Sequence, residues 1–243
     1  MSSTDIRPSI IKRHRLSTRL WHWLNVICLA TLFMSGLGIF NAHPRLYWGQ
    51  YGANFDAPWL ELRRFPGWIT LPGHYSLADA RHWHLAAAPI FAFALLLYML
   101  WSLLNGHFKH DLAFRKGEIA PRHIWQDILD HARLRFPTGE AATRYNVLQK
   151  GAYNKLLFLF LPVLIFSGLA MSPGMNAAWP WLIDIFGGRQ SARSIHFIAA
   201  WATVAFFLVH IAMVILAGPL NEVRSMITGW YKVPPEQEGS ARS

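Results

Sequence analysis

Four long runs of apolar residues constrain what this chain can fold into more than any other feature of its sequence. They contain no Asp, Glu, Lys or Arg, and histidines occur in three of them. The runs are Trp21–Phe40, Trp83–Leu104, Leu156–Ser172 and Ser194–Ala217. About 20 apolar residues let a helix cross a hydrocarbon layer about 30 Å thick. Lipid offers backbone groups no hydrogen-bond partners, so each run is predicted to be a helix. The third run is short, but Tyr153 and Lys155 can extend it toward the headgroups.

The composition excludes most soluble classes of protein. Hydrophobic residues make up 53% of the chain and charged residues 15%, against about 25% charged in an ordinary globular domain. Cys28 is the single cysteine, which excludes an intramolecular disulfide, a Cys-ligated iron–sulfur cluster and covalent haem attachment through C-x-x-C-H.

The distribution of basic residues predicts the direction of the spans. Residues 1–20, 105–155 and 218–243 hold seventeen Lys and Arg, whereas residues 41–82 and 173–193 hold six. Loops rich in Lys and Arg stay in the cytoplasm, so both termini and the middle loop are predicted to be cytoplasmic. The net charge of +10 is then explained by topology and by lipid headgroups, and we expect no nucleic-acid partner.

We therefore predict an all-α fold, an integral membrane four-helix bundle with both termini in the cytoplasm and the lipid bilayer as its surroundings. Residues 1–243 are interpreted as one domain. The predicted spans are about 18–40, 82–105, 152–172 and 193–217, with an outer loop at 41–81 and an inner loop at 106–151.

Four of the twelve histidines lie within the apolar runs: His22, His84, His196 and His210. An ionisable side chain within a span is costly and therefore indicates a function. His196 and His210 are 14 residues apart, which on an α-helix places them on nearly the same side and about 21 Å apart along the axis. The predicted depths pair His22 with His210 toward the inside and His84 with His196 toward the outside.

Two facing imidazoles at each depth fit an axially ligated haem better than a bare metal ion. Zinc and copper sites usually need three or four converging protein ligands, whereas a porphyrin supplies four nitrogens itself. We therefore predict two non-covalent b-type haems in the bundle core. Iron with two histidine ligands has no open position, which favours electron transfer.

Two other histidines compete for the outer site. His82 lies two residues before His84 and so points about 200° away on a helix, and His43 follows the first span. A weak internal repeat favours His84: residues 80–85 resemble residues 192–197 at an offset of 112, which aligns His84 with His196. Residues 33–37 likewise resemble residues 165–169 at an offset of 132. The remaining histidines are interpreted as solvent-facing or headgroup residues: His14, His74, His107, His110, His123 and His131.

Two further groups of residues have two interpretations each. Gly36, Gly38 and Gly168 either give a flat macrocycle room against the backbone or simply pack helices closely. Arg19, Arg81 and Arg193 either pair with haem propionates or only set the topology.

Several motifs resemble those of the bacterial di-haem cytochrome b family. They are Arg19–Trp23 (RLWHW), Phe40–Gly49 (FNAHPRLYWG), Ala80–His84 (ARHWH) and the His196–His210 pair. This family includes cytochrome b subunits of nickel–iron hydrogenase, formate dehydrogenase and thiosulfate reductase, as well as cytochrome b561. The resemblance implies that His22 and His210 hold the inner haem and that His84 and His196 hold the outer one. It also implies a quinone-reactive site and an oxidoreductase partner on the outer face, often a molybdopterin enzyme; His82 departs from the Arg common in such motifs.

Three functional hypotheses follow. The first is a membrane subunit that passes electrons between the quinone pool and a periplasmic redox enzyme through two b haems. The second is a self-contained oxidoreductase of the cytochrome b561 type, such as a superoxide:quinone oxidoreductase. The third is a haem-free transporter or anchor that uses the histidines as proton sites.

Overall fold

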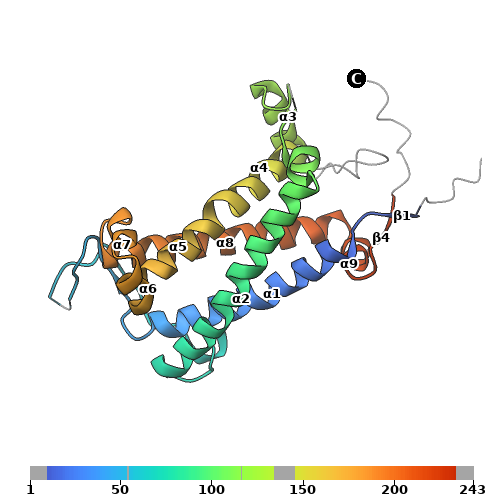
Figure 1. Cartoon of the computed structure of the whole chain (residues 1–243). Helices are drawn as coiled ribbons and strands as arrows, with labels where there is room; N and C mark the ends of the chain where they lie inside the picture. Colours follow the sequence, from blue (N-terminus) through green and yellow to red (C-terminus); the bar gives the residue numbers. More distant parts are fainter. Residues whose placement is uncertain (1–9, 54, 116, 134–145, 234–243) are drawn as a thin grey trace, which may run out of the picture. The chain divides into compact units, whose positions relative to one another are not determined.

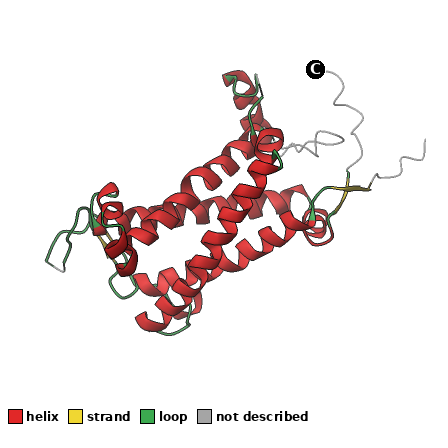
Figure 2. Cartoon of the chain, in the orientation of Figure 1, coloured by secondary structure: helices red, strands yellow, loops and turns green. Residues whose placement is uncertain are grey.

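The computed structural model describes residues 10–53, 55–115, 117–133 and 146–233. Helices dominate this part of the chain (Figure 2). Four of them are long and apolar enough to cross a membrane: α1 (Leu16–Phe40), α2 (Leu77–Leu104), the helix over Val147–Met171 and α8 (Arg189–Ala217). These are the four spans that the apolar runs predict, and Figure 1 shows each of them.

The third span is assembled from three segments. α4 (Val147–Lys155) continues through the π-helical turn η4 (Leu156–Phe160) into α5 (Leu161–Met171). Pro162 is in the first turn of α5. A proline has no N–H to donate and its ring clashes with the carbonyl four residues earlier, and a π turn is one way a helix absorbs such a disruption.

Three spans begin four or five residues earlier than hydropathy predicts. α2 begins at Leu77 rather than near residue 82, α4 at Val147 rather than 152, and α8 at Arg189 rather than 193. The extra residues are polar or charged turns that remain helical beyond the apolar run. Hydropathy therefore marks the part of a helix that suits lipid, whereas the hydrogen-bonded helix extends past it.

Short elements occupy the loops. The outer loop carries β2 (Arg45–Leu46), β3 (Leu60–Glu61) and the 3-10 turn η1 (Gly67–Ile69). The later segments are the π-helical turn η2 (Phe108–Leu112), α3 (Pro121–Ala132), α6 (Pro173–Ala178), α7 (Trp181–Ile185) and α9 (Pro219–Thr228).

Two small antiparallel sheets add to the predicted all-α fold. β1 (Ile10–Lys12) pairs with β4 (Trp230–Lys232), with Ile11 opposite Tyr231. β2 pairs with β3, with Arg45 opposite Glu61. Two-residue and three-residue strands carry too short a pattern to be recognised from alternation in the sequence.

The chain divides into two compact units. We call the described residues of 23–99 and 155–205 the loop unit, and those of 1–22, 100–154 and 206–243 the terminal unit. Each long helix contributes residues to both units.

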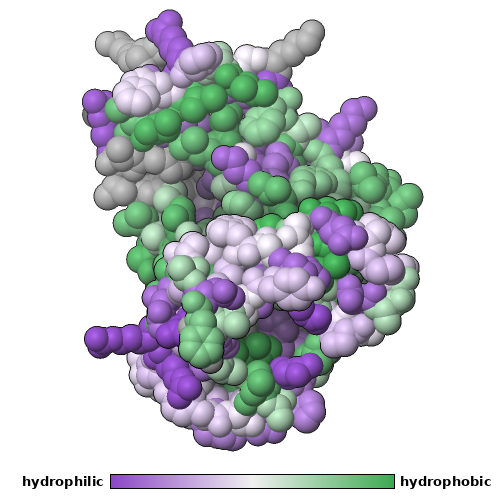
Figure 3. Space-filling view, turned by 90° about the vertical axis from the view of Figure 1, so that its left-hand side faces the viewer, coloured by the Kyte–Doolittle hydropathy of each residue, from purple (hydrophilic) through white to green (hydrophobic). Residues whose placement is uncertain are grey.

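In the loop unit, α7 packs against the third and fourth spans. Leu182 and Ile183 of α7 form a buried cluster with Ala170 of α5 and Ala192 of α8, and both alanines are fully buried. Small residues at such positions let helices approach closely. Aromatic side chains stay exposed in the same unit, and they include Trp48, Tyr51, Trp68, Trp179 and Trp181. Figure 3 shows hydrophobic and hydrophilic side chains mixed on the face that it presents, as suits residues at a membrane–water boundary.

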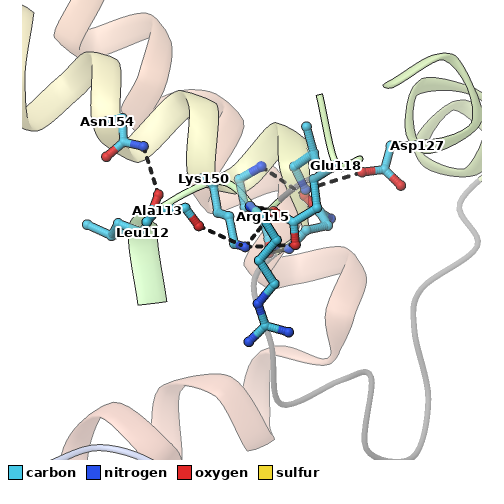
Figure 4. Close-up of polar contacts among 10 residues, drawn as sticks. Leu112, Ala113, Arg115, Glu118, Asp127, Lys150 and Asn154 are labelled. Carbon is cyan, nitrogen blue, oxygen red and sulfur yellow. Dashed lines mark hydrogen bonds and ion pairs between the residues drawn. The ribbon is translucent and has the colours of Figure 1, made fainter. Parts of the chain in front are cut away.

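In the terminal unit, a buried lysine fixes the segment that follows α2. Lys150 of α4 is 5% exposed, and its Nζ lies 2.8 Å from Oε2 of Glu118. It also donates a 3.4 Å hydrogen bond to the Ala113 carbonyl. One turn further along, Asn154 Nδ2 donates to the Leu112 carbonyl at 3.0 Å. Figure 4 shows these side chains converging on the loop between the second and third spans.

Candidate functional site

In the loop unit, His84 of α2 and His196 of α8 face one another. Their ring centroids are 6.2 Å apart and the ring planes are inclined by 61°. Both side chains are partly buried, whereas His82 is exposed. The structure therefore places His84 rather than His82 opposite His196, which is the choice that the internal repeat favours.

Hydrogen bonds fix the Nδ1 atom of each of these two imidazole rings. His84 Nδ1 lies 3.1 Å from the Leu32 carbonyl and 3.0 Å from Ser35 Oγ. The Ser35 hydroxyl donates to the Thr31 carbonyl at 2.6 Å. A carbonyl oxygen can only accept, so the proton of His84 is on Nδ1 and Nε2 is left with its lone pair. This tautomer is the one that a metal bound at Nε2 requires.

The same arrangement recurs around His196. His196 Nδ1 lies 2.9 Å from Ser167 Oγ, and the Ser167 hydroxyl donates to the Val163 carbonyl. The Leu164 carbonyl is a further hydrogen-bond partner of His196. The residues that contact the two histidines are thus related by the offset of 132 seen in the sequence. Residues of α1 orient the histidine of α2, and the corresponding residues of the third span orient the histidine of α8.

Glycine follows serine in both copies, and it serves the histidine directly. A methyl group built on Gly36 would lie 3.6 Å from His84 Cε1, and one on Gly168 would lie 3.4 Å from His196 Cε1. These two glycines therefore let the edge of an imidazole approach the helix backbone. Gly38 has a different role, because a methyl group there would lie 3.0 Å from Ala80 Cβ. It is a helix-packing glycine, as the second interpretation states.

In the terminal unit, His22 of α1 and His210 of α8 form a second pair. Their ring centroids are 6.4 Å apart and the planes are inclined by 56°. Phe206 stacks on His210 with a centroid distance of 6.1 Å and nearly parallel planes, and Tyr153 meets Phe206 edge-on at 5.9 Å. An aromatic stack thus fixes the ring of His210 on one face.

The spacing of both pairs fits one metal atom between two imidazoles. A ligating nitrogen lies about 2.0–2.1 Å from a bound metal and about 1.1 Å from its own ring centroid, so opposite imidazoles have centroids about 6.3 Å apart. The observed distances are 6.2 Å and 6.4 Å. No cluster of three or more His, Cys, Asp or Glu side chains that could hold a metal ion occurs among the described residues. Each pair therefore suits a group that brings its own remaining ligands, as a porphyrin does.

The other predicted residues have separate environments. His43 stacks on Tyr47 at 5.8 Å rather than facing a histidine. Burial and the nearby Arg193 and Arg45 guanidinium groups lower the pKa of His43, which keeps the ring neutral at pH 7.

His14 is partly buried, although the sequence predicts a solvated or headgroup residue. Desolvation together with Arg13, His22 and Arg19 lowers the pKa of His14 to about 4. The reason is that Gly229 turns back over this part of the chain and its carbonyl accepts the His14 N–H. Of the other histidines in this group, His74, His110 and His123 are exposed and His107 is partly buried, while the side chain of His131 lies outside the described residues.

The three candidate arginines also differ from one another. Arg19 donates to the Ile227 carbonyl, Arg81 is exposed, and Arg193 donates to the His43 carbonyl. Arg193 alone belongs to a buried polar cluster in the loop unit.

Sequence reasoning missed the residues that orient the histidines. Ser35 and Ser167 lie in the two matching pentapeptides, so a signal was present. Their role depends on which helix packs beside which histidine, and neither hydropathy nor spacing specifies that pairing.

Known proteins resemble this chain along most of its length. The family model for prokaryotic cytochrome b561 matches residues 13–229. A relative from Azospira oryzae, named as a subunit of a protein-methionine-sulfoxide reductase (YedZ1), is 32% identical over 82% of this chain and 87% of its own length. A Ni/Fe-hydrogenase B-type cytochrome subunit from Cupriavidus necator is 26% identical over 87% of this chain and 83% of its own. Its namesake for hydrogenase 1 of Escherichia coli K12 is 21% identical over 87% of this chain and 86% of its own.

The family model covers most of the chain and the relatives match along most of their lengths. The four membrane-length helices agree with them, and cytochromes of the b type carry non-covalent haem. The protein is a membrane electron-transfer cytochrome, and the chain belongs to the prokaryotic cytochrome b561 family.

Proposed function

We propose that this protein carries electrons between the membrane quinone pool and a periplasmic redox enzyme through two b-type haems. His22 and His210 would hold one haem, and His84 and His196 the other. The observation that carries the proposal is the spacing of the two imidazole pairs, 6.4 Å and 6.2 Å between ring centroids.

The chain's own residues prepare the ligands of the second pair. The Leu32 carbonyl and the Ser35 hydroxyl hold the proton of His84 on Nδ1, and Ser167 acts in the same way on His196. Hydrogen bonds at Nδ1 orient each imidazole ring and raise the basicity of its Nε2 toward a metal. A haem held by His84 and His196 would supply reversible one-electron chemistry there.

We further propose that the protein lies in the bacterial inner membrane with both termini in the cytoplasm. The excess of Lys and Arg in the terminal and middle segments supports this orientation. The pairing of β1 with β4 supports placing both ends of the described chain on one side of the membrane.

The partner is proposed to be a periplasmic oxidoreductase, such as a molybdopterin-dependent enzyme. Relatives are named as subunits of a protein-methionine-sulfoxide reductase and of Ni/Fe-hydrogenases. An enzyme of the sulfoxide reductase type is the first partner to test, since that relative is the more similar of these two.

Spectroscopy of the purified protein tests the haem assignment. Reduced-minus-oxidised difference spectra with pyridine haemochrome quantification should give two b haems per chain. His22→Ala and His196→Ala should each remove one haem. His82→Ala is the matched control, because this exposed neighbour of His84 should leave both haems in place. Full haem content in either ligand variant contradicts the assignment.

A second experiment separates the proposal from a self-contained oxidoreductase. Protein in liposomes that contain quinol should show reduced haem, and reoxidation should require the added partner enzyme. Steady turnover with superoxide and quinone in the absence of any partner would instead support the self-contained cytochrome b561 type.

A further inference from the structure

A partly buried polar cluster lies in the loop unit beside the N-terminal half of α8. It consists of His43, Tyr47 and Arg193. The His43 ring stacks on the Tyr47 ring with a centroid distance of 5.8 Å. Arg193 donates to the His43 carbonyl, and its guanidinium carbon lies 5.8 Å from the centroid of the Phe40 ring.

This cluster holds buried polar atoms that the described protein does not satisfy. Tyr47 is 3% exposed. Neither its hydroxyl nor His43 Nε2 makes a hydrogen bond of ordinary geometry within the described chain, and the Arg45 side chain makes only a looser contact with the Tyr47 hydroxyl. Buried polar groups normally have a partner, because each unsatisfied one costs free energy. The two atoms therefore indicate a ligand that the chain itself does not supply.

The charge of the cluster indicates that this ligand is an anion. The guanidinium groups of Arg193 and Arg45 both interact electrostatically with Tyr47 and with His43. Arg45 is paired with Glu61 at 2.8 Å. Among the described residues no carboxylate lies within salt-bridge distance of Arg193, and a partly buried guanidinium is stabilised by a carboxylate.

Hydrogen bonds to α8 hold the cluster in position. Ser194 Oγ donates to the Tyr47 carbonyl at 2.6 Å and accepts from Trp59 Nε1 at 2.9 Å. Ser191 Oγ accepts from the Gly49 N–H at 2.7 Å. The segment from His43 to Gly49 is therefore attached to α8 at His43, Tyr47 and Gly49, so the ligand groups are preorganised.

The cluster lies one helical turn from a proposed iron ligand. Arg193 precedes His196 by three residues, which on an α-helix is about 4.5 Å along the axis and about 60° around it. Phe40, which faces Arg193, stacks on Phe197 with a centroid distance of 4.9 Å. The cluster and the His84–His196 pair thus belong to one packed region of the loop unit.

We propose that His43, Tyr47 and Arg193 form a carboxylate-binding site whose ligand is a propionate of the haem held by His84 and His196. This inference rests on the proposed function, because it requires a haem between these histidines. Arg193 supplies the positive charge, and the Tyr47 hydroxyl and His43 Nε2–H donate hydrogen bonds to the carboxylate oxygens.

The test measures the midpoint potentials of the two haems in Tyr47→Phe and Arg193→Gln. Both changes leave the propionate less compensated, which stabilises the ferric state. The potential of one haem should fall, for Arg193→Gln by the equivalent of about a tenfold change in the redox equilibrium, about 59 mV for one electron. Tyr47→Phe should give a smaller fall, and the other haem should not change. Tyr51→Phe is the matched control, since this tyrosine of the same loop is 86% exposed.

Haem substitution identifies the ligand. Apoprotein reconstituted with haem dimethyl ester has no propionate charge, so the difference between wild type and Tyr47→Phe should disappear. A difference that persists with the ester overturns the proposal, because the site then holds another anion. Arg193→Lys replaces Arg193→Gln in the test if the Gln variant does not fold. Its haem midpoint potential should fall by less, because lysine keeps the positive charge.

The failures of the two proposals are distinguishable. A colourless wild-type protein contradicts the proposed function. Normal haem content with unchanged potentials in both Tyr47→Phe and Arg193→Gln contradicts the carboxylate site alone.

Discussion

Ser35 and Ser167 each donate their hydroxyl proton to a carbonyl of their own helix. The hydroxyl oxygen of each then accepts a hydrogen bond from a histidine on the neighbouring helix. Ser35 donates to the Thr31 carbonyl and Ser167 to the Val163 carbonyl. Each serine therefore accepts from an imidazole Nδ1–H, at 3.0 Å in one case and 2.9 Å in the other. Such contacts fix the orientation of a metal ligand without touching the metal.

Replacing these serines should weaken haem binding without abolishing it. In Ser35→Ala and Ser167→Ala a backbone carbonyl still accepts the Nδ1–H, from Leu32 and Leu164 respectively. We expect haem to be retained about tenfold less tightly, the lower end of the range for such contacts. Haem transfer to apomyoglobin measures the loss. Ser225→Ala is the control, since this buried serine bonds the Glu222 carbonyl instead; an equal loss there would mean that the effect is general.

At the scale of the element, two glycines that are two residues apart on α1 meet different neighbours. Gly36 faces the edge of His84, whereas Gly38 faces Ala80 Cβ and the Leu71 carbonyl. Ala80 is 1% exposed and has no room to move outward. The same residue type thus serves a ligand in one case and helix packing in the other.

Gly38→Ala should destabilise the protein more than Gly36→Ala. The added methyl group would lie 3.0 Å from Ala80 Cβ at Gly38, but 3.6 Å from the nearest atom at Gly36. Overpacking of a helix contact costs about 1–3 kcal/mol, while Gly36→Ala also gains helix propensity of up to about 1 kcal/mol. Thermal unfolding in detergent measures both. A smaller loss at Gly38 than at Gly36 would show that α2 yields easily at this contact.

The ion pair between Glu118 and Lys150 predicts a pH dependence of stability. Partial burial alone would raise the pKa of Glu118, but the Arg115 N–H and the Lys150 ammonium lower it below its ordinary value of 4.5. A lowered carboxyl pKa adds stability that is complete above the unfolded value and is lost as the pH falls through the folded one. Glu118→Gln should therefore cost about 1–3 kcal/mol at pH 7, less than a fully buried pair because Glu118 is partly exposed.

The difference between wild type and Glu118→Gln should vanish below the folded pKa of Glu118, in denaturation curves recorded from pH 7 to pH 3. Lys150→Met should cost less than Glu118→Gln, because it leaves no buried ammonium. Asp79→Asn is the control, since its pair with His74 is exposed. If the difference in free energy of unfolding between wild type and Glu118→Gln does not change with pH, the destabilisation comes from altered packing.

At the scale of the whole molecule, the positive-inside pattern predicts which loops face the periplasm. Cys28 is 5% exposed, so a new surface cysteine can be labelled against a low background. Tyr51→Cys should react with a membrane-impermeant maleimide on intact spheroplasts. His123→Cys should react only after permeabilisation, since both side chains are exposed but lie in loops of opposite predicted sides. The reverse pattern would invert the proposed orientation.

Much of this molecule follows from its sequence, because lipid imposes strong rules. The four spans and the pairing of His84 with His196 and of His22 with His210 follow from apolar length, depth and helical phase. The small sheets and the buried Lys150 do not, since they depend on hydrogen bonds between segments distant in the chain. Tyr47 is the clearest case: it counts as one of many loop aromatics in the sequence, yet it is fully packed against α8.

The ribbon between β1 and β4 also fixes the order in which the molecule can be completed. Ile10–Lys12 is synthesised before the first membrane helix, but its partner Trp230–Lys232 follows the last one. The N-terminal strand must therefore wait without its partner while every span is threaded into the bilayer. The ribbon can therefore close only after the last membrane helix has been synthesised.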